Sequence, residues 1–290
     1  MKPIFAKILE DLTQEVYDVR VIDLPFFSTE FHFHRECQMV YVVESEGKRI
    51  IGDSVEAFAS DELILLGSDI PHVWHNDKSY FEKNNKGAHA VSFALFFNPD
   101  KLIELLSHFM PVKKIETVLK TAKFGMMFSG QAKQSFKELL IGMIRQNKLN
   151  QMISLLKILE LLTITKEYIL LASRGYVNTY QAKDNDRIDK VFKYVFSNFT
   201  REIQLDEVAD LINMNKQAFC RYFKSRTQKT FVEFVNDIRI SHACKLMHDG
   251  GHSIGSIAYD CGFNSLSNFN RFFKEVKRIT PREYKKMIEV

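Results

Sequence analysis

The sequence predicts an α+β chain of two domains, a small antiparallel β-barrel followed by helices and then an all-helical domain. Short segments rich in β-branched and aromatic residues, broken by Gly, Asp or Ser, occupy positions 17–97. From Pro99 onward, apolar residues recur three and four positions apart, which is the period of a helix. After a polar stretch, a pattern of about fifty residues occurs twice. We therefore expect domains at 1–175 and 187–290, joined by a linker at 176–186.

The elements follow in order from these patterns. We expect strands at the six short segments YDVRVIDL (17–24), QMVYVVE (38–44), KRIIG (48–52), VEAFA (55–59), DELILLG (61–67) and HAVSFALFF (89–97). We expect helices at PDKLIELLSHF (99–109), VKKIETVLKTA (112–122), QSFKELLIGMIRQ (134–146) and MISLLKILELLTITKEYILLA (152–172). The last of these has about the length of a membrane span, but four charged residues interrupt it, so a buried or interface helix is the better interpretation.

Composition and charge limit the class of protein. A chain of 290 residues with 46% hydrophobic and 26% charged residues is typical of a globular protein. The four cysteines show no paired spacing and the N-terminal segment MKPIFAKILEDLTQEV has no apolar signal core, so we expect a cytoplasmic protein. Residues 184–290 hold 18 basic and 14 acidic residues, whereas residues 1–183 hold 22 of each. The excess positive charge therefore lies at the C-terminal end, which favours an anionic partner.

The C-terminal domain contains an internal repeat. QLDEVADLINM (204–214) aligns with SIGSIAYDCGF (253–263) at an offset of 49, and beyond the turn Phe219 and Arg221 match Phe269 and Arg271 at an offset of 50. Each copy predicts a short helix, a tight turn and a second helix, at about 204–225 and 253–275. In each second helix, aromatic residues spaced i, i+3 and i+4 form an inward stripe and leave a polar face opposite.

The polar faces carry the side chains that a major-groove reader needs. Arg pairs with guanine through two hydrogen bonds, and Gln or Asn pairs with adenine in the same way. Lysines, small polar side chains and helix N-termini hold phosphates, so we expect backbone contacts from Asn215, Lys216, Lys224, Asn264, Ser265, Asn270 and Lys274. An amphipathic helix can also present its polar face only to water. Two copies with the same arrangement favour double-stranded DNA as the partner.

The repeat resembles the DNA-binding domain of the AraC/XylS family of bacterial transcription regulators. The resemblance rests on LDEVADLINMNKQAFCRYFKSRT and on a second motif at Gly262, Phe263, Phe269, Arg271, Phe273, Lys274, Thr280, Pro281 and Tyr284. It implies two helix-turn-helix units whose base-reading positions fall on Gln217, Cys220, Arg221, Ser267, Asn268 and Arg271. The chain departs from the family at Gln228 and Arg278, where a glycine usually follows each reading helix, and at Lys285, where the family has Arg.

The first domain resembles the cupin-type regulatory domain found in many members of that family. The matching segments are FHFHRECQMVYVVESEGKRIIGD and LLGSDIPHVW. In metal-binding cupins the corresponding positions are His32, His34, Gln38 and His72, but Gln38 replaces the usual acid. We therefore expect no metal or other cofactor; if a metal binds, the three histidines would hold it. We expect these residues to line a pocket for a small polar molecule, with lining residues His32, His34, Gln38, His72, Trp74 and Phe93.

These patterns together predict a sequence-specific DNA-binding transcription regulator, not an enzyme, whose DNA binding is modulated by a small molecule in the barrel. The alternatives are a metal-dependent cupin enzyme, which would not explain the repeat, and a protein-interaction module. The apolar helix at 152–172 is a candidate surface for a homodimer, although the barrel could equally cover it. RNA polymerase would be a further partner if the protein is an activator, and the sequence leaves activation and repression open.

Overall fold

The computed structural model describes residues 16–27, 31–81, 89–178 and 185–288, apart from the side chains of residues 78, 185, 186 and 189. The chain divides into two compact units. Among the described residues, the N-terminal unit holds 16–27, 31–54, 58–81 and 89–178, and the C-terminal unit holds 185–288 with Val55–Ala57. Two segments lie outside the described residues. They are residues 1–15, most of the N-terminal segment MKPIFAKILEDLTQEV, and residues 179–184, part of the expected linker.

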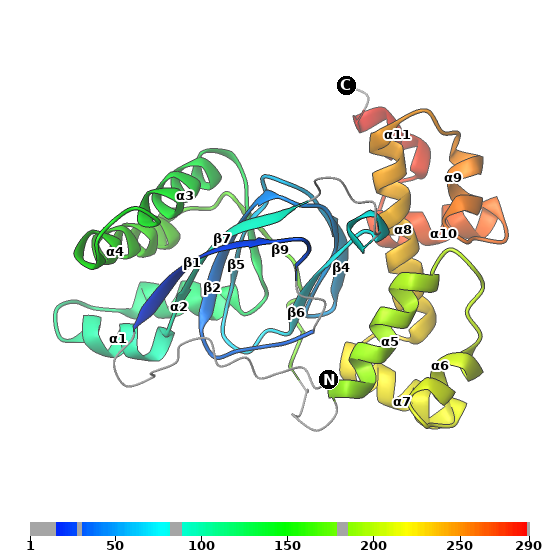
Figure 1. Cartoon of the computed structure of the whole chain (residues 1–290), viewed down its shortest axis with the longest axis horizontal. Coiled ribbons are helices and arrows are strands. Elements are labelled where there is room, and N and C mark those ends of the chain that lie inside the picture. The colour runs from blue at the N-terminus through cyan, green and yellow to red at the C-terminus, as the bar shows by residue number, and fades with distance from the viewer. Residues whose placement is uncertain (1–15, 28–30, 82–88, 179–184, 289–290) are drawn as a thin grey trace. The chain divides into compact units, whose positions relative to one another are not determined.

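The strands of the N-terminal unit form two sheets (Figure 1). The first has the order β1 (Tyr17–Leu24), β7 (Ala90–Phe97), β2 (Cys37–Glu44), β5 (Leu63–Leu66), β8 (Met126–Phe128) and β9 (Tyr168–Leu170). The second has the order β4 (Ser54–Phe58), β3 (Gly47–Ile51) and β6 (His72–Asn76). The six expected strands are confirmed, whereas β6, β8 and β9 were not expected. The expected barrel closure is not observed, because the hydrogen-bonded strands divide into two sheets of which neither closes on itself.

The central strands of the six-stranded sheet, β2 and β5, are largely buried on both faces. Along β5, Leu63 and Leu65 point to one core and Ile64 and Leu66 to another, and all four are fully buried. The first core lies against four helices, α1 (Pro99–Ser107), α2 (Lys113–Ala122), α3 (Gly130–Met143) and α4 (Lys148–Ile164). The second contains residues of both sheets, including Val40 of β2, Phe58 of β4 and Trp74 of β6. A strand that is buried on both faces reads as an unbroken apolar run, as LILL does.

The expected helix at 152–172 is wrong in its second part. Helix α4 ends at Ile164, Thr165 adopts an extended conformation, and Tyr168–Leu170 pairs with β8 as strand β9. Leu155, Leu159 and Leu162 are buried in the first core, so the N-terminal unit itself covers most of the apolar stripe. Four large apolar residues of α4 remain exposed, namely Leu149, Ile153, Leu156 and Ile164. No helix in the described ranges combines the length and the apolar character needed to cross a membrane.

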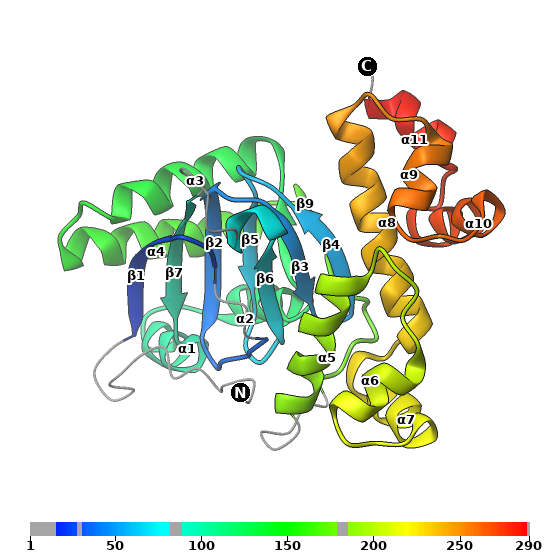
Figure 2. The same ribbon diagram turned by 45° about the vertical axis from the view of Figure 1, so that its right-hand side comes forward.

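Residues 185–288, which make up most of the C-terminal unit, are helical, as expected (Figures 1 and 2). It contains α5 (Asn185–Asn198), α6 (Leu205–Leu211), α7 (Lys216–Thr227), α8 (Phe231–Asp249), α9 (Ile254–Asp260), α10 (Leu266–Lys277) and α11 (Pro281–Ile288). The long helix α8 is the central element: both views place the α6–α7 pair at one of its ends and the α9–α10 pair at the other. At ~1.5 Å per residue its 19 residues span about 28 Å.

Candidate DNA interface and effector cavity

The two helix pairs are built from the same turn. In α6–α7 the turn residue Asn213 has φ 55°, and in α9–α10 the corresponding residue Gly262 has φ 84°. The next residue of each turn donates its backbone N–H to the helix before it, Met214 to Ala209 O at 2.9 Å and Phe263 to Ala258 O at 3.1 Å. The sequence repeat is therefore also a repeat of backbone geometry, at the same offset of 49.

A polar side chain caps the start of each second helix. The Asn215 side chain accepts the N–H of Ala218 at 2.8 Å, and Ser265 Oγ accepts the N–H of Asn268 at 3.2 Å. Asn264, which we expect to contact the DNA backbone, is exposed and lies one residue before the cap. Both reading helices end on a left-handed residue, Gln228 at φ 59° and Arg278 at φ 63°. The family's glycine would adopt this conformation without strain.

Aromatic side chains fix each second helix to its own core. Phe219 and Phe223 of α7 are fully buried among rings of α5 and α8, including Phe192, Phe231 and Phe234. In the second pair the fully buried residues Phe269 and Phe273 of α10 pack against Phe263 and Tyr284. Because the inward stripe is set in this way, the opposite face of each helix is held toward solvent.

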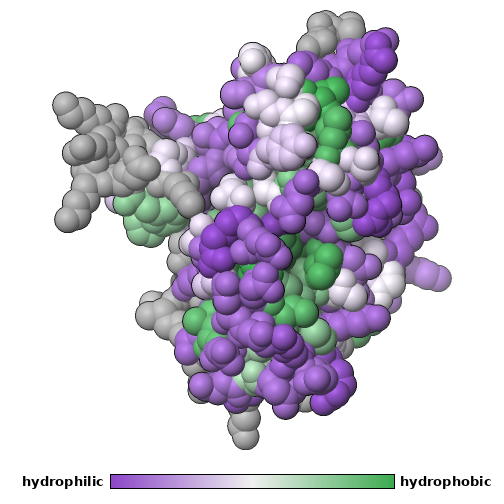
Figure 3. Space-filling model, turned by 90° about the vertical axis from the view of Figure 1, so that its right-hand side faces the viewer, coloured by the Kyte–Doolittle hydropathy of each residue, from purple (hydrophilic) through white to green (hydrophobic). Residues whose placement is uncertain are grey.

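The predicted reading positions lie on these outward faces. All six base-reading candidates are exposed, namely Gln217, Cys220, Arg221, Ser267, Asn268 and Arg271. The candidates for backbone contacts are also exposed, namely Asn215, Lys216, Lys224, Asn264, Asn270 and Lys274, whereas the capping residue Ser265 is half-buried. Figure 3 shows a mainly hydrophilic surface, with smaller apolar areas, on the side where Figure 1 places α6, α7, α9 and α10.

Two of the predicted contact residues are engaged in ion pairs that the sequence analysis missed. Lys216 Nζ lies 2.7 Å from Asp206 Oδ2, and Arg271 Nη1 lies 3.1 Å from Glu275 Oε1. The Arg271 guanidinium also lies 4.0 Å from the centroid of the Phe272 ring. The Arg271 pair joins residues i and i+4 of α10, a spacing that could have predicted it. The carboxylate of Glu275 therefore occupies one of the hydrogen-bond donors of Arg271.

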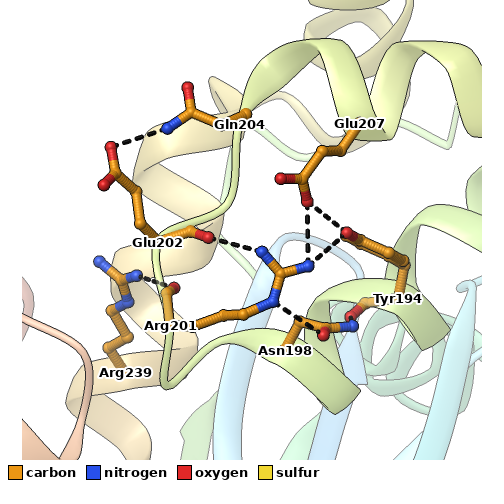
Figure 4. A network of polar contacts seen from close by, with 7 residues as sticks. All are labelled: Tyr194, Asn198, Arg201, Glu202, Gln204, Glu207 and Arg239. Carbon is orange, nitrogen blue, oxygen red and sulfur yellow. Dashed lines mark hydrogen bonds and ion pairs between the residues drawn. The ribbon is translucent and has the colours of Figure 1, made fainter.

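A polar network anchors the first helix pair to α5 and α8 (Figure 4). Arg201 donates to Tyr194 Oη at 2.6 Å and to Glu207 Oε2 at 3.0 Å, and Tyr194 donates to the same carboxylate. From α8, Arg239 donates to the carbonyls of Phe199 and Arg201, each at 2.8 Å. The hydrogen bonds from Arg201 and Tyr194 lower the pKa of Glu207. The network joins residues of α5, α6, α8 and the α5–α6 loop, so no local sequence pattern could have revealed it.

The cysteines differ sharply in accessibility, which gives a direct test of the reading face. Cys220 is exposed, whereas Cys37, Cys244 and Cys261 are buried. Burial raises the pKa of Cys37 to about 12 and also raises the pKa of Cys244. Because the thiolate is the reactive form, we expect a thiol reagent at neutral pH to label one cysteine rapidly, at Cys220. Mass spectrometry of the labelled peptides measures this, and Cys220→Ser is the control. Rapid labelling of Cys244 or Cys261 in the native protein would contradict the placement of α8 and α9.

The N-terminal unit contains a cavity of about 300 Å³. Four of the six predicted pocket residues line it: His32, Gln38, His72 and Trp74. His34 is buried beside them, with Nε2 3.3 Å from Gln38 Oε1. The expectation for Phe93 is wrong. On strand β7 the residues Ser92 and Phe96 line the cavity, whereas Phe93 points the other way, to the core that contains Tyr41.

The cavity wall is mainly apolar. Its apolar residues come from strands β1, β2 and β7 and from the segment after β1, and they are Ile22, Leu24, Phe27, Val40, Val42 and Phe96. Arg20, which the sequence analysis missed, adds a cation at the wall; its guanidinium lies 5.3 Å from the centroid of Phe96 and is paired with Asp18 at 2.6 Å. Alternation along β1, from Arg20 to Ile22 and Leu24, was the signal that could have found it.

The histidines beside the cavity are held neutral. Burial, and next the neighbouring His32, lower the pKa of His34 to about 4. The same two effects, with His34 as a further neighbour, lower the pKa of His72 well below its usual value. At neutral pH both rings therefore act as neutral imidazoles, each with one hydrogen-bond donor and one lone pair.

Comparison with known proteins finds a domain match in the C-terminal region. A family model described as a helix-turn-helix domain matches residues 208–287. The chain is 23% identical over 266 residues to YdeC of Bacillus subtilis, an HTH-type transcriptional regulator named as uncharacterized, and the match covers 88% of this chain and 86% of that protein. The TCP pilus virulence regulatory protein of Vibrio cholerae is 32% identical over 111 residues, which are 38% of this chain and 40% of that protein.

The comparison of structures gives only a distant likeness. The crystal structure of ToxT from Vibrio cholerae aligns with 94% of this chain and 98% of its own, at 19% identity and a TM-score of 0.36.

The family match and the repeat concern the same residues. The matched residues, 208–287, run from within α6 through most of α11 and include both reading helices. They also include the motif from Gly262 to Tyr284 on which the resemblance rests. The chain therefore carries, at residues 208–287, a helix-turn-helix domain that resembles those of AraC/XylS-family regulators.

Proposed function

We propose that this protein is a sequence-specific DNA-binding transcription regulator in which α6–α7 and α9–α10 act as two helix-turn-helix units. The observation that carries the proposal is the repeated helix pair, with the same turn, cap and outward polar face at both ends of α8. The length of α8, about 28 Å, is of the order of the ~34 Å between successive major grooves on one side of DNA. The two reading helices α7 and α10 would then enter adjacent grooves.

The residues of each reading helix would divide into two groups. Base edges would be read by Gln217, Cys220 and Arg221 on α7 and by Ser267, Asn268 and Arg271 on α10. The capping and flanking polar residues would hold phosphates and so fix the register on the duplex. Cys220 is a poor hydrogen-bond partner, so its contribution would be an apolar contact, for example with a thymine methyl.

Residues 1–175 would be the regulatory domain of cupin type, with its effector in the 300 Å³ cavity of the N-terminal unit. The mainly apolar wall favours a small molecule with an apolar body and few polar groups, in place of the polar molecule that the sequence suggested. Effector binding would bias how the DNA-binding domain, residues 187–290, is presented to DNA. The protein would be a cytoplasmic homodimer, and the exposed apolar residues Leu149, Ile153 and Leu156 of α4 would lie in its dimer contact. If the protein is an activator, RNA polymerase would be a further partner.

The regulator is favoured over the metal-dependent enzyme that also fitted the sequence. The two relatives described above are named as regulatory proteins, and one of them matches most of this chain. The enzyme would leave the repeated helix pair without a role.

Selection of random DNA duplexes on the full-length protein tests the proposal. Enrichment of two short motifs about one helical turn apart would support two reading helices on one face of the duplex. Binding that is sensitive to salt but enriches no sequence would contradict sequence reading and indicate contacts to the backbone alone. Failure to bind any duplex would contradict the proposal altogether.

Single substitutions on the reading helices should separate the two groups of residues. Arg221→Ala and Arg271→Ala are each expected to cost about 1–3 kcal/mol in binding to the selected duplex and to relax the preference at one base position. Lys216→Ala is the matched control, because loss of a phosphate contact should weaken all sequences alike and flatten the salt dependence. Equal losses for all three variants on selected and random DNA would rule out the base-reading assignment.

Glu275→Gln tests whether the ion pair between Glu275 and Arg271 weakens DNA binding by Arg271. The variant removes the carboxylate that holds Arg271 at 3.1 Å, and also removes a negative charge from the reading helix. We expect tighter binding to the selected duplex, and a smaller gain when Arg271 is already Ala. The double-mutant cycle measures that difference, and an equal gain in both backgrounds would show that the Glu275 effect does not act through Arg271.

A further inference from the structure

The N-terminal unit contains a second cleft, apart from the effector cavity. Its volume is about 580 Å³, and residues of α1 and α2 line it together with residues near the start of β2 and the end of β5. Helices α1 and α2 lie next to each other in both ribbon views (Figures 1 and 2). Small molecules bind in clefts of roughly 300–1,000 Å³, so the size of this cleft suits a small ligand.

Strand β2 separates the cleft from the effector cavity. Cys37 lines the cleft, whereas Gln38, the next residue, lines the effector cavity. Successive side chains of a strand point to opposite faces of the sheet. The Cys37 side chain accordingly belongs to the core that α1, α2, α3 and α4 cover. The cleft is therefore a separate site and not an extension of the effector cavity.

Helices α1 and α2 present charges of opposite sign to the cleft. Helix α1 contributes the carboxylates of Asp100 and Glu104, which lie four residues apart and so on one face of the helix. Helix α2 and its C-cap contribute the ammonium groups of Lys120 and Lys123. All four residues are exposed, and in the described part of the chain none of them takes part in an ion pair. Opposite charges therefore face the same cleft without neutralising each other.

The lining between these charges is mainly apolar. Pro99, Leu119 and Cys37 are buried there, and Ile103 is half-buried. Burial raises the pKa of the Cys37 thiol to about 12, whereas the charge of Lys123 lowers it and the charge of Asp100 raises it. One charge from each side of the cleft therefore lies close enough to act on the same buried atom.

We propose that this cleft binds a short peptide that has free termini and an apolar side chain. The peptide ammonium would lie against Asp100 and Glu104, and its carboxylate would lie against the two lysines. The apolar side chain would cover the buried lining. A free amino acid carries both charges on one carbon, whereas each further residue of a peptide adds up to about 3.8 Å between them. Because the charges of α1 and α2 form no ion pair across the cleft, the ligand needs charges that are separated in space.

The remaining charged residues of the cleft also fit a peptide. They are Glu116 of α2, which is half-buried, and the exposed residues Arg35 and Asp69. Carboxylates accept hydrogen bonds from peptide N–H groups, and a guanidinium donates to peptide carbonyls. In total, four carboxylates and three cations line the cleft, so neither a simple anion nor a simple cation matches it.

Isothermal titration calorimetry of the full-length protein with the tripeptide Ala-Leu-Ala tests the site. We expect one peptide per chain and a dissociation constant below about 1 mM. Acetylation of the peptide N-terminus and amidation of its C-terminus should each weaken binding about 10-fold, because each removes one charged partner. Free leucine should bind more weakly than the tripeptide. No detectable binding of Ala-Leu-Ala in the millimolar range, or equal binding of free leucine, would overturn the proposal.

Two double variants assign the ends of the peptide. Asp100→Asn with Glu104→Gln should weaken binding of Ala-Leu-Ala about 10-fold, and acetylation of the peptide should then cost little more. Lys120→Gln with Lys123→Gln should give the same result with amidation in place of acetylation. If both modifications cost as much in the variants as in the wild type, the assignment of the two ends is wrong.

Lys113→Gln with Lys114→Gln is the matched control. Both lysines are exposed on α2 and lie outside the lining of the cleft, and the variant changes the charge by the same amount as Lys120→Gln with Lys123→Gln. It should bind the tripeptide like the wild type, and an equal loss would reduce the effect to general attraction and contradict the site. Circular dichroism checks that each variant folds. The titrations use no DNA, so their outcome is independent of the proposed regulator function.

Discussion

Phe273→Ala is expected to destabilise the C-terminal unit by about 3–5 kcal/mol, because it removes a large aromatic side chain from a packed core. Phe273 is fully buried, and its ring centroid lies 5.5 Å from that of Phe269 and 5.6 Å from that of Tyr284. The loss would remove the contacts that hold α10 to α8 and α11, so we also expect binding to the selected duplex to fall. Phe272→Ala is the matched control, because Phe272 lies on the same helix, is half-buried and should cost less.

The position of the single tryptophan allows this effect to be assigned to one unit. Trp74 lies in the N-terminal unit, so its fluorescence reports the unfolding of that unit alone. The C-terminal unit is helical and contributes strongly to far-UV circular dichroism. In urea, Phe273→Ala should move a circular-dichroism transition to lower concentration and leave the tryptophan transition in place. An equal shift of both transitions would contradict the assignment to the C-terminal unit.

Gly262→Ala is expected to cost about 2–4 kcal/mol, from backbone strain and a close contact together. Gly262 has φ 84°, a conformation that disfavours any residue with a Cβ. A Cβ there would also lie 2.7 Å from the carbonyl oxygen of Phe199 and 2.8 Å from the backbone of Thr200, and neither can move as a flexible side chain could. The α9–α10 turn therefore requires glycine for two reasons.

Gly251→Ala separates those two reasons. Gly251 has φ 76°, and a Cβ at this position would meet no atom within 4 Å. This variant should therefore show the cost of the backbone conformation alone, about 1 kcal/mol. Urea denaturation followed by circular dichroism measures both variants. Equal losses at the two positions would show that the contact with Phe199 and Thr200 contributes nothing.

Much of the secondary structure could be predicted because it depends on local periodicity. The apolar period of 3.6 predicted the helical character of the C-terminal domain and its two repeated helix pairs, and β-branched and aromatic runs predicted six strands. The errors occur where a strand is defined by its partner. Strand β6, with the sequence HVWHN, exists because it pairs with β3, and the segment after Ile164 leaves the helix because it pairs with β8. No window along the sequence contains those partners.

The candidate sites also contain some features that follow from local sequence patterns and others that depend on tertiary contacts. The repeat predicted the outward faces of α7 and α10, because a buried aromatic stripe determines the opposite face of a helix. It could not predict the Arg201–Glu207–Tyr194 network, which joins residues of separate elements. In the cavity, strand alternation places Phe93 and Phe96 on opposite faces of β7. Only the folded sheet determines which of the two faces meets the cavity.

The sequence by itself determined the order of the units, the helical character of the second unit, its repeat and the residues on its reading faces. Each of these follows from spacing along the chain, because side-chain direction in a helix depends on position within the turn. Only the tertiary structure decided that the strands form two sheets, that Glu275 holds Arg271, and that three histidines present their nitrogens within 4.8 Å of one another. These features depend on distances between atoms, which the fold fixes when it brings the strands and helices together.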